Sequence, residues 1–150
     1  MDSDKTVLTG SCLCGSVQVS VTGPALLTFA CHCRDCQKFS ASAYSLSAMF
    51  PSDGFACTGD LVVGGRGSPE RTHYFCKSCM GFVFSRITGA DHRVNLRISV
   101  LDDAAEFEPF VELMTGEKLP WASVPAVHSY TSYPESVEDL QMLMDAYSRR

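Results

Sequence analysis

The chain has 150 residues, 45% of them hydrophobic, and a formal net charge of −5. A chain of this length can bury a continuous core without disulfide bonds, so we expect a single domain over residues 1–150. No apolar stretch approaches the roughly 18 residues of a membrane span, and no dense basic stripe marks a nucleic-acid surface. The start of the chain lacks the basic and apolar parts of a signal peptide, which predicts a cytoplasmic protein.

Most of the sequence alternates between apolar and polar side chains, which is typical of half-buried β-strands. The clearest runs lie at 17–22, 44–50 and 94–100. Shorter strand candidates lie at 27–32, 55–58, 71–76, 82–87 and 110–114. The glycine-rich stretch 64–69 predicts a hairpin loop between two strands. We therefore expect a predominantly β fold.

The C-terminal residues show the clearest helical pattern of the chain. Ser136 and Asp139 have the spacing of a helix-capping box. The apolar residues that follow lie on one stripe of a helix, and they are Val137, Leu140, Leu143, Met144 and Tyr147. Amphipathic helices usually pack on their own domain, so we expect this stripe to contact the core.

Seven of the eight cysteines fall into three clusters. The clusters are Cys12-Leu13-Cys14, Cys31-His32-Cys33-Arg34-Asp35-Cys36 and Cys76-Lys77-Ser78-Cys79. In an extended strand, two cysteines separated by one residue point to the same face, and a C-x-x-C turn also brings two sulfurs together. Gly15 and Gly81 leave room for backbone N–H groups to approach these sulfurs. In a reducing compartment such clusters predict zinc rather than disulfides, and the spacing leaves open which clusters pair.

Four segments resemble the glutathione-dependent formaldehyde-activating enzyme (GFA) family, whose domain also occurs in centromere protein V. The segments are GSCLCGSV, CHCRDCQKFSASA, FCKSCM and PFVELMTGEKLPW. The resemblance runs from about Gly10 to Trp121. It implies a mainly β, Mss4-like fold of several small coiled antiparallel β-sheets around zinc, to which the sequence adds the C-terminal helix.

The resemblance also implies two Zn²⁺ sites. The residues that match the ligands of a structural zinc are Cys12, Cys14, Cys76 and Cys79. The residues that match the ligands of a second, catalytic zinc are Cys31, Cys33 and Cys36. The chain departs from the family at Ala41 and Met80, where members usually have glycine. Cys57 matches no ligand motif, and we expect it to be a small buried apolar residue.

Three protein ligands leave one position on a zinc ion open, which is typical of catalytic rather than structural sites. We also expect this zinc to be the more labile of the two. The activity implied by the resemblance is that of a carbon–sulfur lyase, which forms or cleaves the adduct of a small thiol such as glutathione with an aldehyde such as formaldehyde. The alternative is a non-enzymatic interaction module in which both zinc ions are structural.

Proton transfer during such a reaction needs an acid or base near the metal, and the candidates are His32, Asp35, His73 and Glu112. His32 lies between two ligands, so strand alternation turns it away from the metal and favours a packing role. His92 and His128 have the sequence context of surface residues. Trp121 is expected either to close the pocket or to pack in the core.

A loose set of basic side chains occupies the middle of the chain. Its members are Arg66, Arg71, Lys77, Arg86, Arg93 and Arg97. One interpretation is a solvated surface. The other is that these side chains balance negative metal–thiolate centres or hold a small anionic substrate.

Overall fold

The structure is a computed structural model, and it describes residues 6–150. These residues form eleven strands and two α-helices, joined in part by short 3₁₀ turns. The strands are β1 (Val7–Ser11), β2 (Gln18–Thr22), β3 (Leu27–Cys31), β4 (Ser45–Pro51), β5 (Ala56–Thr58), β6 (Leu61–Gly64), β7 (Arg71–Cys76), β8 (Phe82–Ile87), β9 (Arg93–Arg97), β10 (Val111–Leu113) and β11 (His128–Ser129). The helices are α1 (Arg34–Ser40) and α2 (Val137–Ser148). The expected mainly β fold with a C-terminal helix is confirmed.

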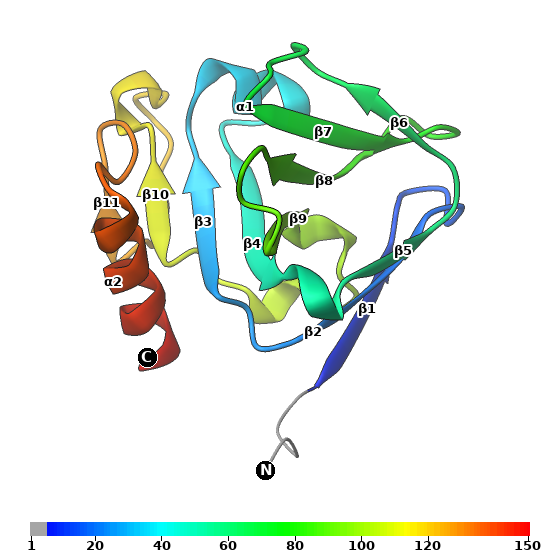
Figure 1. The fold of residues 1–150 in the computed structure, drawn as a ribbon. Helices are drawn as coiled ribbons and strands as arrows, with labels where there is room; N and C mark the ends of the chain where they lie inside the picture. Colours follow the sequence, from blue (N-terminus) through cyan, green and yellow to red (C-terminus); the bar gives the residue numbers. More distant parts are fainter. Residues whose placement is uncertain (1–5) are drawn as a thin grey trace.

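The strands form two sheets, one with the order β1-β2-β5 and one with the order β11-β10-β3-β4-β9-β8-β7-β6. In Figure 1 the longer sheet curves from α2 and β10 round to β7 and β6, and the shorter sheet lies on the side away from α2. Most neighbouring strands are antiparallel, as expected. The pairs that β10 makes with β3 and with β11 are parallel, because long connections bring the chain back to this edge.

The core lies between the two sheets and is built from the apolar faces that the alternation indicates. In β2, Val19 and Val21 are buried while Gln18 is exposed. Strand β1 approaches the segment after β9 very closely at Gly10, where a Cβ atom would lie 2.0 Å from the carbonyl oxygen of Val100. Only glycine fits this crossing, since any side chain would collide with backbone.

Several element boundaries differ from those expected. The run 94–100 is a strand only as far as Arg97, and Ile98–Val100 forms a 3₁₀ turn. Helix α1 was not expected, because its seven residues are too few to show a periodic apolar stripe. The hairpin loop at 64–69 is confirmed, since β6 and β7 on either side of it pair antiparallel.

The C-terminal helix has the cap that its sequence indicates. The Ser136 hydroxyl oxygen accepts a hydrogen bond of 3.1 Å from the backbone N–H of Asp139. Leu143 and Tyr147 are buried against the rest of the chain, whereas Val137 at the first turn is 79% exposed. The apolar stripe therefore packs on the domain from its second turn onward. Within residues 6–150, no helix has both the length and the apolar character needed to cross a membrane.

Candidate metal centres and the adjoining cavity

The first and third cysteine clusters meet in one group, which we call the four-cysteine group: Cys12, Cys14, Cys76 and Cys79. Cys12 and Cys14 follow the end of β1, Cys76 ends β7, and Cys79 lies in the turn from β7 to β8. The Sγ atoms all lie within 4.8 Å of one another, and those of Cys12 and Cys14 are 3.6 Å apart. The tertiary structure thus selects one pairing of clusters among those that the spacing left open.

The surroundings of the four-cysteine group suit thiolate ligands. The backbone N–H of Val17 donates to the Cys12 sulfur at 3.3 Å, and the N–H groups of Ser78 and Cys79 donate to the Cys76 sulfur. A hydrogen bond with the Ser16 hydroxyl lowers the pKa of the Cys14 thiol to about 6. Four sulfur donors arranged round one point are the ligand set of a closed zinc site.

The middle cluster forms a second group, which we call the cysteine trio: Cys31, Cys33 and Cys36. Cys31 ends β3, Cys33 is the N-cap residue of α1, and Cys36 lies in the first turn of that helix. The spacing of Cys31 and Cys33 suggested that both lie in one extended strand, but only Cys31 does. Their sulfurs converge because the chain turns into α1 after β3. Within residues 6–150, no further Cys, His, Asp or Glu ligand atom joins this group.

The three thiols of the trio oppose one another's ionisation. Hydrogen bonds with the Cys31 and Cys36 thiols lower the pKa of Cys33 to about 2, whereas hydrogen bonds and burial raise the pKa of Cys31. One thiolate is thus stabilised by neighbours that keep their protons. A bound divalent cation would remove that restriction, because metal binding displaces thiol protons. The donor set of the trio fits zinc with one coordination position left for another ligand.

A cationic side chain lies close behind the trio. Arg97 is 91% buried, as its exposed fraction is 9%. Its guanidinium carbon lies 5.1 Å from the centre of the Phe82 ring, and its Nε and Nη1 atoms have no hydrogen-bond partner. Burial lowers the pKa of Arg97, and the charge of Cys36 acts in the opposite direction by favouring the protonated guanidinium. This arginine fits the interpretation that basic side chains balance a negative metal–thiolate centre.

A cavity of about 360 Å³ opens beside Cys31 and Cys36. Its walls are mostly apolar and come from β3, β4, β10 and α2, through Leu27, Phe29, Met49, Val111, Leu113 and Leu140. Polar side chains of β7, β8 and β9 also line the cavity, and they are Arg71, His73, Ser85, Arg93 and Asn95. Two of the three trio cysteines, Cys31 and Cys36, therefore border a space of ligand size.

Of the expected acid–base candidates, His73 is the one that lines this cavity. Its ring stacks on Phe39 of α1 at a centroid distance of 4.5 Å, which holds the imidazole beside the trio. Asp35 instead lies at the surface and pairs with Arg66 at 3.4 Å. The structure thus separates His73 from the other candidates by position.

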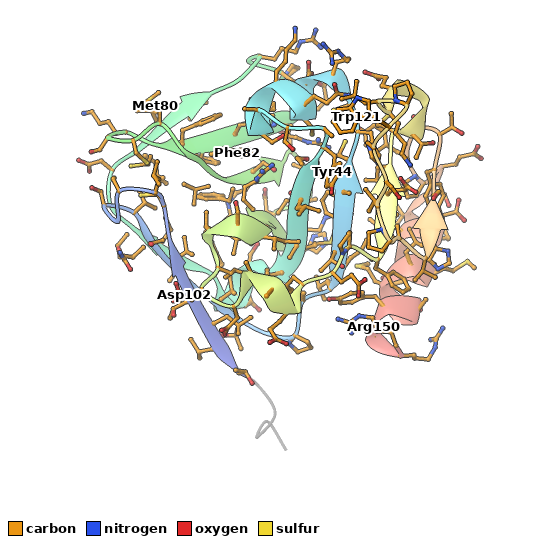
Figure 2. All side chains as sticks on the ribbon, turned by 180° about the vertical axis from the view of Figure 1, so that it is seen from behind. Tyr44, Met80, Phe82, Asp102, Trp121 and Arg150 are labelled. Carbon is orange, nitrogen blue, oxygen red and sulfur yellow. The ribbon has the colours of Figure 1, made fainter. Side chains whose placement is uncertain are left out.

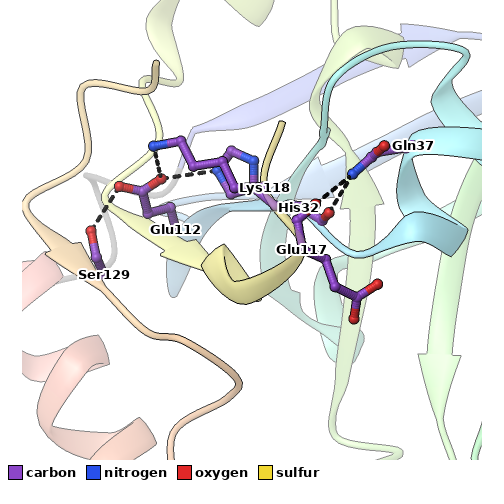
Figure 3. A network of polar contacts seen from close by, with 6 residues as sticks. All are labelled: His32, Gln37, Glu112, Glu117, Lys118 and Ser129. Atoms are coloured by element: carbon purple, nitrogen blue, oxygen red, sulfur yellow. Dashed lines mark hydrogen bonds and ion pairs between the residues drawn. The ribbon is translucent and has the colours of Figure 1, made fainter. Parts of the chain in front are cut away.

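His32 and Glu112 form a buried polar network behind the trio (Figure 3). His32 Nε2 lies 2.9 Å from a Glu112 oxygen, which also accepts from Lys118, while Ser129 donates to the other oxygen. Burial opposes ionisation of Glu112, but these hydrogen bonds outweigh it and lower the pKa of the carboxyl group. The Gln37 amide donates to the backbone oxygen of His32 at 2.7 Å. Neither His32 nor Glu112 lines the cavity, and the network fixes the turn that carries the ligand sulfurs.

Three other residues singled out in the sequence lie away from the trio. Trp121 is 73% exposed beside α1, so the expectation of a core role is wrong, and it does not line the main cavity (Figure 2). His92 is exposed as expected, whereas His128 is half-buried and its ring meets Phe110 edge-on.

Cys57 lies outside both cysteine groups. It belongs to β5 in the smaller sheet and is half-buried rather than fully buried, although it packs against the core as expected. Burial and the nearby Cys12 thiol raise its pKa. Cys57 is therefore on the side of the four-cysteine group and does not supply a fourth sulfur to the trio.

Tyr133, which was not expected from the sequence, lines the cavity just before α2. Burial and the charge of Cys31 raise its pKa to about 12, against the opposite effect of Arg71. No motif marks this tyrosine, and only the docking of α2 beside β3 and β10 brings it to the cavity.

Ala41 and Met80, which replace glycines usual in the family, both adopt left-handed backbone conformations, with φ of 51° and 60°. Ala41 ends α1 as its C-cap residue, and Met80 follows the last cysteine ligand candidate. Figure 2 shows Met80 at the outer edge of the molecule. The turns that glycine would favour are thus formed with a Cβ atom present, at a cost in strain.

We expect Ala41→Gly and Met80→Gly each to stabilise the protein by up to about 1 kcal/mol, because glycine removes the left-handed strain. For a chain of this size the melting temperature should rise by about 3 °C, as measured by circular dichroism. Ala56→Gly is the matched control, since Ala56 is exposed in a regular strand and should lose stability. A loss of stability in both turn variants would contradict this account.

The fold and the two candidate sites place this chain among mainly β proteins that carry two separate cysteine groups suited to metal ions. The sequence model described as glutathione-dependent formaldehyde-activating enzyme matches residues 7–117, and the chain belongs to this family. A solved structure of a Rhodobacter sphaeroides protein has the same fold, with a TM-score of 0.52 and 18% identity over 63% of this chain and 87% of that one. No curated protein matches the sequence.

Proposed function

We propose that the protein is a zinc-dependent carbon–sulfur lyase that forms or cleaves the adduct of a thiol with an aldehyde. The reference pair, from the family, is glutathione and formaldehyde, which give S-(hydroxymethyl)glutathione. In this proposal the four-cysteine group binds a structural zinc and the trio binds a catalytic one, within a single domain over residues 1–150. The observation that carries the proposal is the three-sulfur group bordering a ligand-sized cavity.

The proposed reaction needs a thiolate and a proton carrier. Zinc bound by three thiolates would supply a position at which a thiol stays deprotonated near neutral pH. The carbon–sulfur bond forms between the thiol sulfur and the carbonyl carbon, and the thiol proton ends on the carbonyl oxygen. In the reverse direction the bond breaks and the proton returns to sulfur. His73 is placed to carry this proton, because it lines the cavity and is held by Phe39.

NMR exchange spectroscopy tests the proposed function directly. We expect the zinc-loaded protein to accelerate exchange between free glutathione and S-(hydroxymethyl)glutathione above the uncatalysed rate. Zinc-loaded protein that leaves the rate unchanged, with both zinc ions retained, would overturn the proposal and favour a structural module. The same measurement with other aldehydes ranks the carbonyl partners.

His73→Gln should slow this exchange by about 100-fold, the usual contribution of one acid–base group. Burial and the charge of Arg71 lower the pKa of His73 below 6.5, although Asp35 and Cys33 act in the opposite direction. This direction favours the neutral imidazole, which can accept a proton. The wild-type rate should fall as the pH drops through this lowered pKa, because imidazolium cannot accept one.

The pH profile separates proton transfer from a packing role for His73. The Gln variant should lose the acidic limb that the wild type shows, and His92→Gln at the surface should behave as wild type. An unchanged rate and profile in His73→Gln would remove this residue from the reaction.

The two proposed zinc ions should differ in lability. The trio supplies three ligands beside a cavity, whereas the other group supplies four, with Cys12 and Cys76 buried. Under a mild chelator we expect the trio to lose zinc first while the circular dichroism spectrum is unchanged. Simultaneous loss of both metals and of the fold would contradict this assignment.

A further inference from the structure

Two arginines line the same cavity as Cys31 and Cys36, and neither has an acidic partner among the residues that the structure describes. Arg71 and Arg93 both line it, and within residues 6–150 no carboxylate lies within 4.0 Å of either guanidinium. Asn95, which is 92% buried because its exposed fraction is 8%, also lines the cavity. Arg93 Nε and Asn95 Oδ1 are buried and lack hydrogen-bond partners. Arg93 Nε is a donor that a bound carboxylate would satisfy, whereas Asn95 Oδ1 is an acceptor and would need a donor from another part of the bound molecule.

The two arginines also act on each other. Burial and the charge of Arg71 lower the pKa of Arg93, so the protonated Arg93 guanidinium is destabilised where it stands. Buried or crowded like charges are costly unless an opposite charge joins them. Arg66 shows the contrast, since it lies at the surface and pairs with Asp35. A carboxylate between Arg71 and Arg93 would relieve the repulsion and accept charge-assisted hydrogen bonds.

Strand register places Cys31 and Asn95 at different positions along β4. Cys31 lies opposite Ser45 on β4, and Asn95 lies opposite Met49 on the same strand. Four residues along a strand correspond to about 13 Å. The Arg93 Nη1 atom is 3.3 Å from the Met49 sulfur, so the guanidinium points back along the cavity.

The space between the two ends is apolar on one side. Leu27, Phe29 and Met49 form that side, and Leu140 and Leu143 of α2 close it. The one acidic residue among the lining groups is Glu135, which is exposed at the rim. Tyr133 to Leu143 lie outside the part of the chain that matches the family, so this wall is contributed by the C-terminal segment.

We propose that the cavity selects a substrate with an unbranched apolar body and one carboxylate, which binds between Arg71 and Arg93. The inference rests on the proposed function for the other end of the substrate, where a thiol or aldehyde group reaches Cys31 and Cys36. Glutathione carries two carboxylates and an ammonium group on a polar body. It therefore matches the apolar wall less well than an alkyl carboxylate does.

Octanoate tests the carboxylate end without a thiol, an aldehyde or a metal. In calorimetric titrations of the full chain, we expect octanoate to bind about tenfold more tightly than octanol or octylamine, because only the carboxylate accepts charge-assisted hydrogen bonds. Arg93→Met should bring octanoate down to the affinity of octanol, and Arg93→Lys should recover part of the difference. Arg71→Met provides a second variant should Arg93→Met fail to fold, and Arg66→Met is the surface control.

The outcomes separate this inference from the proposed function. Octanoate binding that depends on Arg93 supports the inference, even when the exchange of glutathione adducts is absent. Equal affinities for octanoate and octanol, tighter binding of octylamine, or Arg71 and Arg93 variants that bind octanoate like wild type would each overturn it. If one of these results is obtained, active exchange with glutathione would not rescue the inference. That exchange tests only the thiol or aldehyde end of the substrate, not its carboxylate end.

Discussion

Cys79→Ser is expected to unfold the protein. Cys79 belongs to the four-cysteine group, which ties the end of β1 in the smaller sheet to the β7–β8 turn in the larger one. Structural zinc sites contribute on the order of 10 kcal/mol of apparent binding free energy, which is comparable with the whole stability of a domain. Serine does not replace a thiolate ligand at neutral pH. The measurements are zinc content by elemental analysis and thermal unfolding by circular dichroism.

Cys57→Ser is the matched control for this prediction, because Cys57 lies in neither cysteine group. It should keep both zinc ions and melt near the wild-type temperature. A Cys79→Ser protein with unchanged zinc content and melting temperature would show that this group does not hold a structural metal. Loss of one zinc in Cys57→Ser would show instead that the eighth cysteine is a ligand.

Cys36→Ser is expected to abolish the proposed exchange activity while the fold survives. Cys36 borders the cavity from the first turn of α1, and its backbone N–H, which donates to the Cys33 sulfur, remains in the variant. Changes to groups that only support a metal ligand cost 10–100-fold, so loss of a ligand should cost more than about 100-fold. Zinc content should fall from two ions to one, with little change in the melting temperature.

The opposite result would favour the structural interpretation. A Cys36→Ser variant that unfolds, or that loses both zinc ions together, would make the trio part of the framework and remove the basis for catalysis there. Octanoate titration of the same variant adds a second readout, because binding at Arg71 and Arg93 should persist in a folded protein.

The sequence alone was sufficient to predict features that depend on neighbouring residues. The alternation in β2 marked its buried face, and Ser136 with Asp139 marked the start of α2. The tight cysteine spacing identified every member of both groups, and the quoted segments identified the family. Such signals are readable because strand periodicity, caps and chelating pairs are set within a few positions of one chain.

Only the tertiary structure decided which distant residues meet. Spacing could not choose the partner of the first cluster, since that depends on β1 ending beside the β7–β8 turn. Nor could it separate His73, which reaches the cavity, from Glu112, which lies behind the trio. The two arginines and Tyr133 come together only because the curved sheet and α2 enclose one space. Contacts between residues that are distant in the sequence depend on how the whole core packs, and no local sequence pattern encodes that packing.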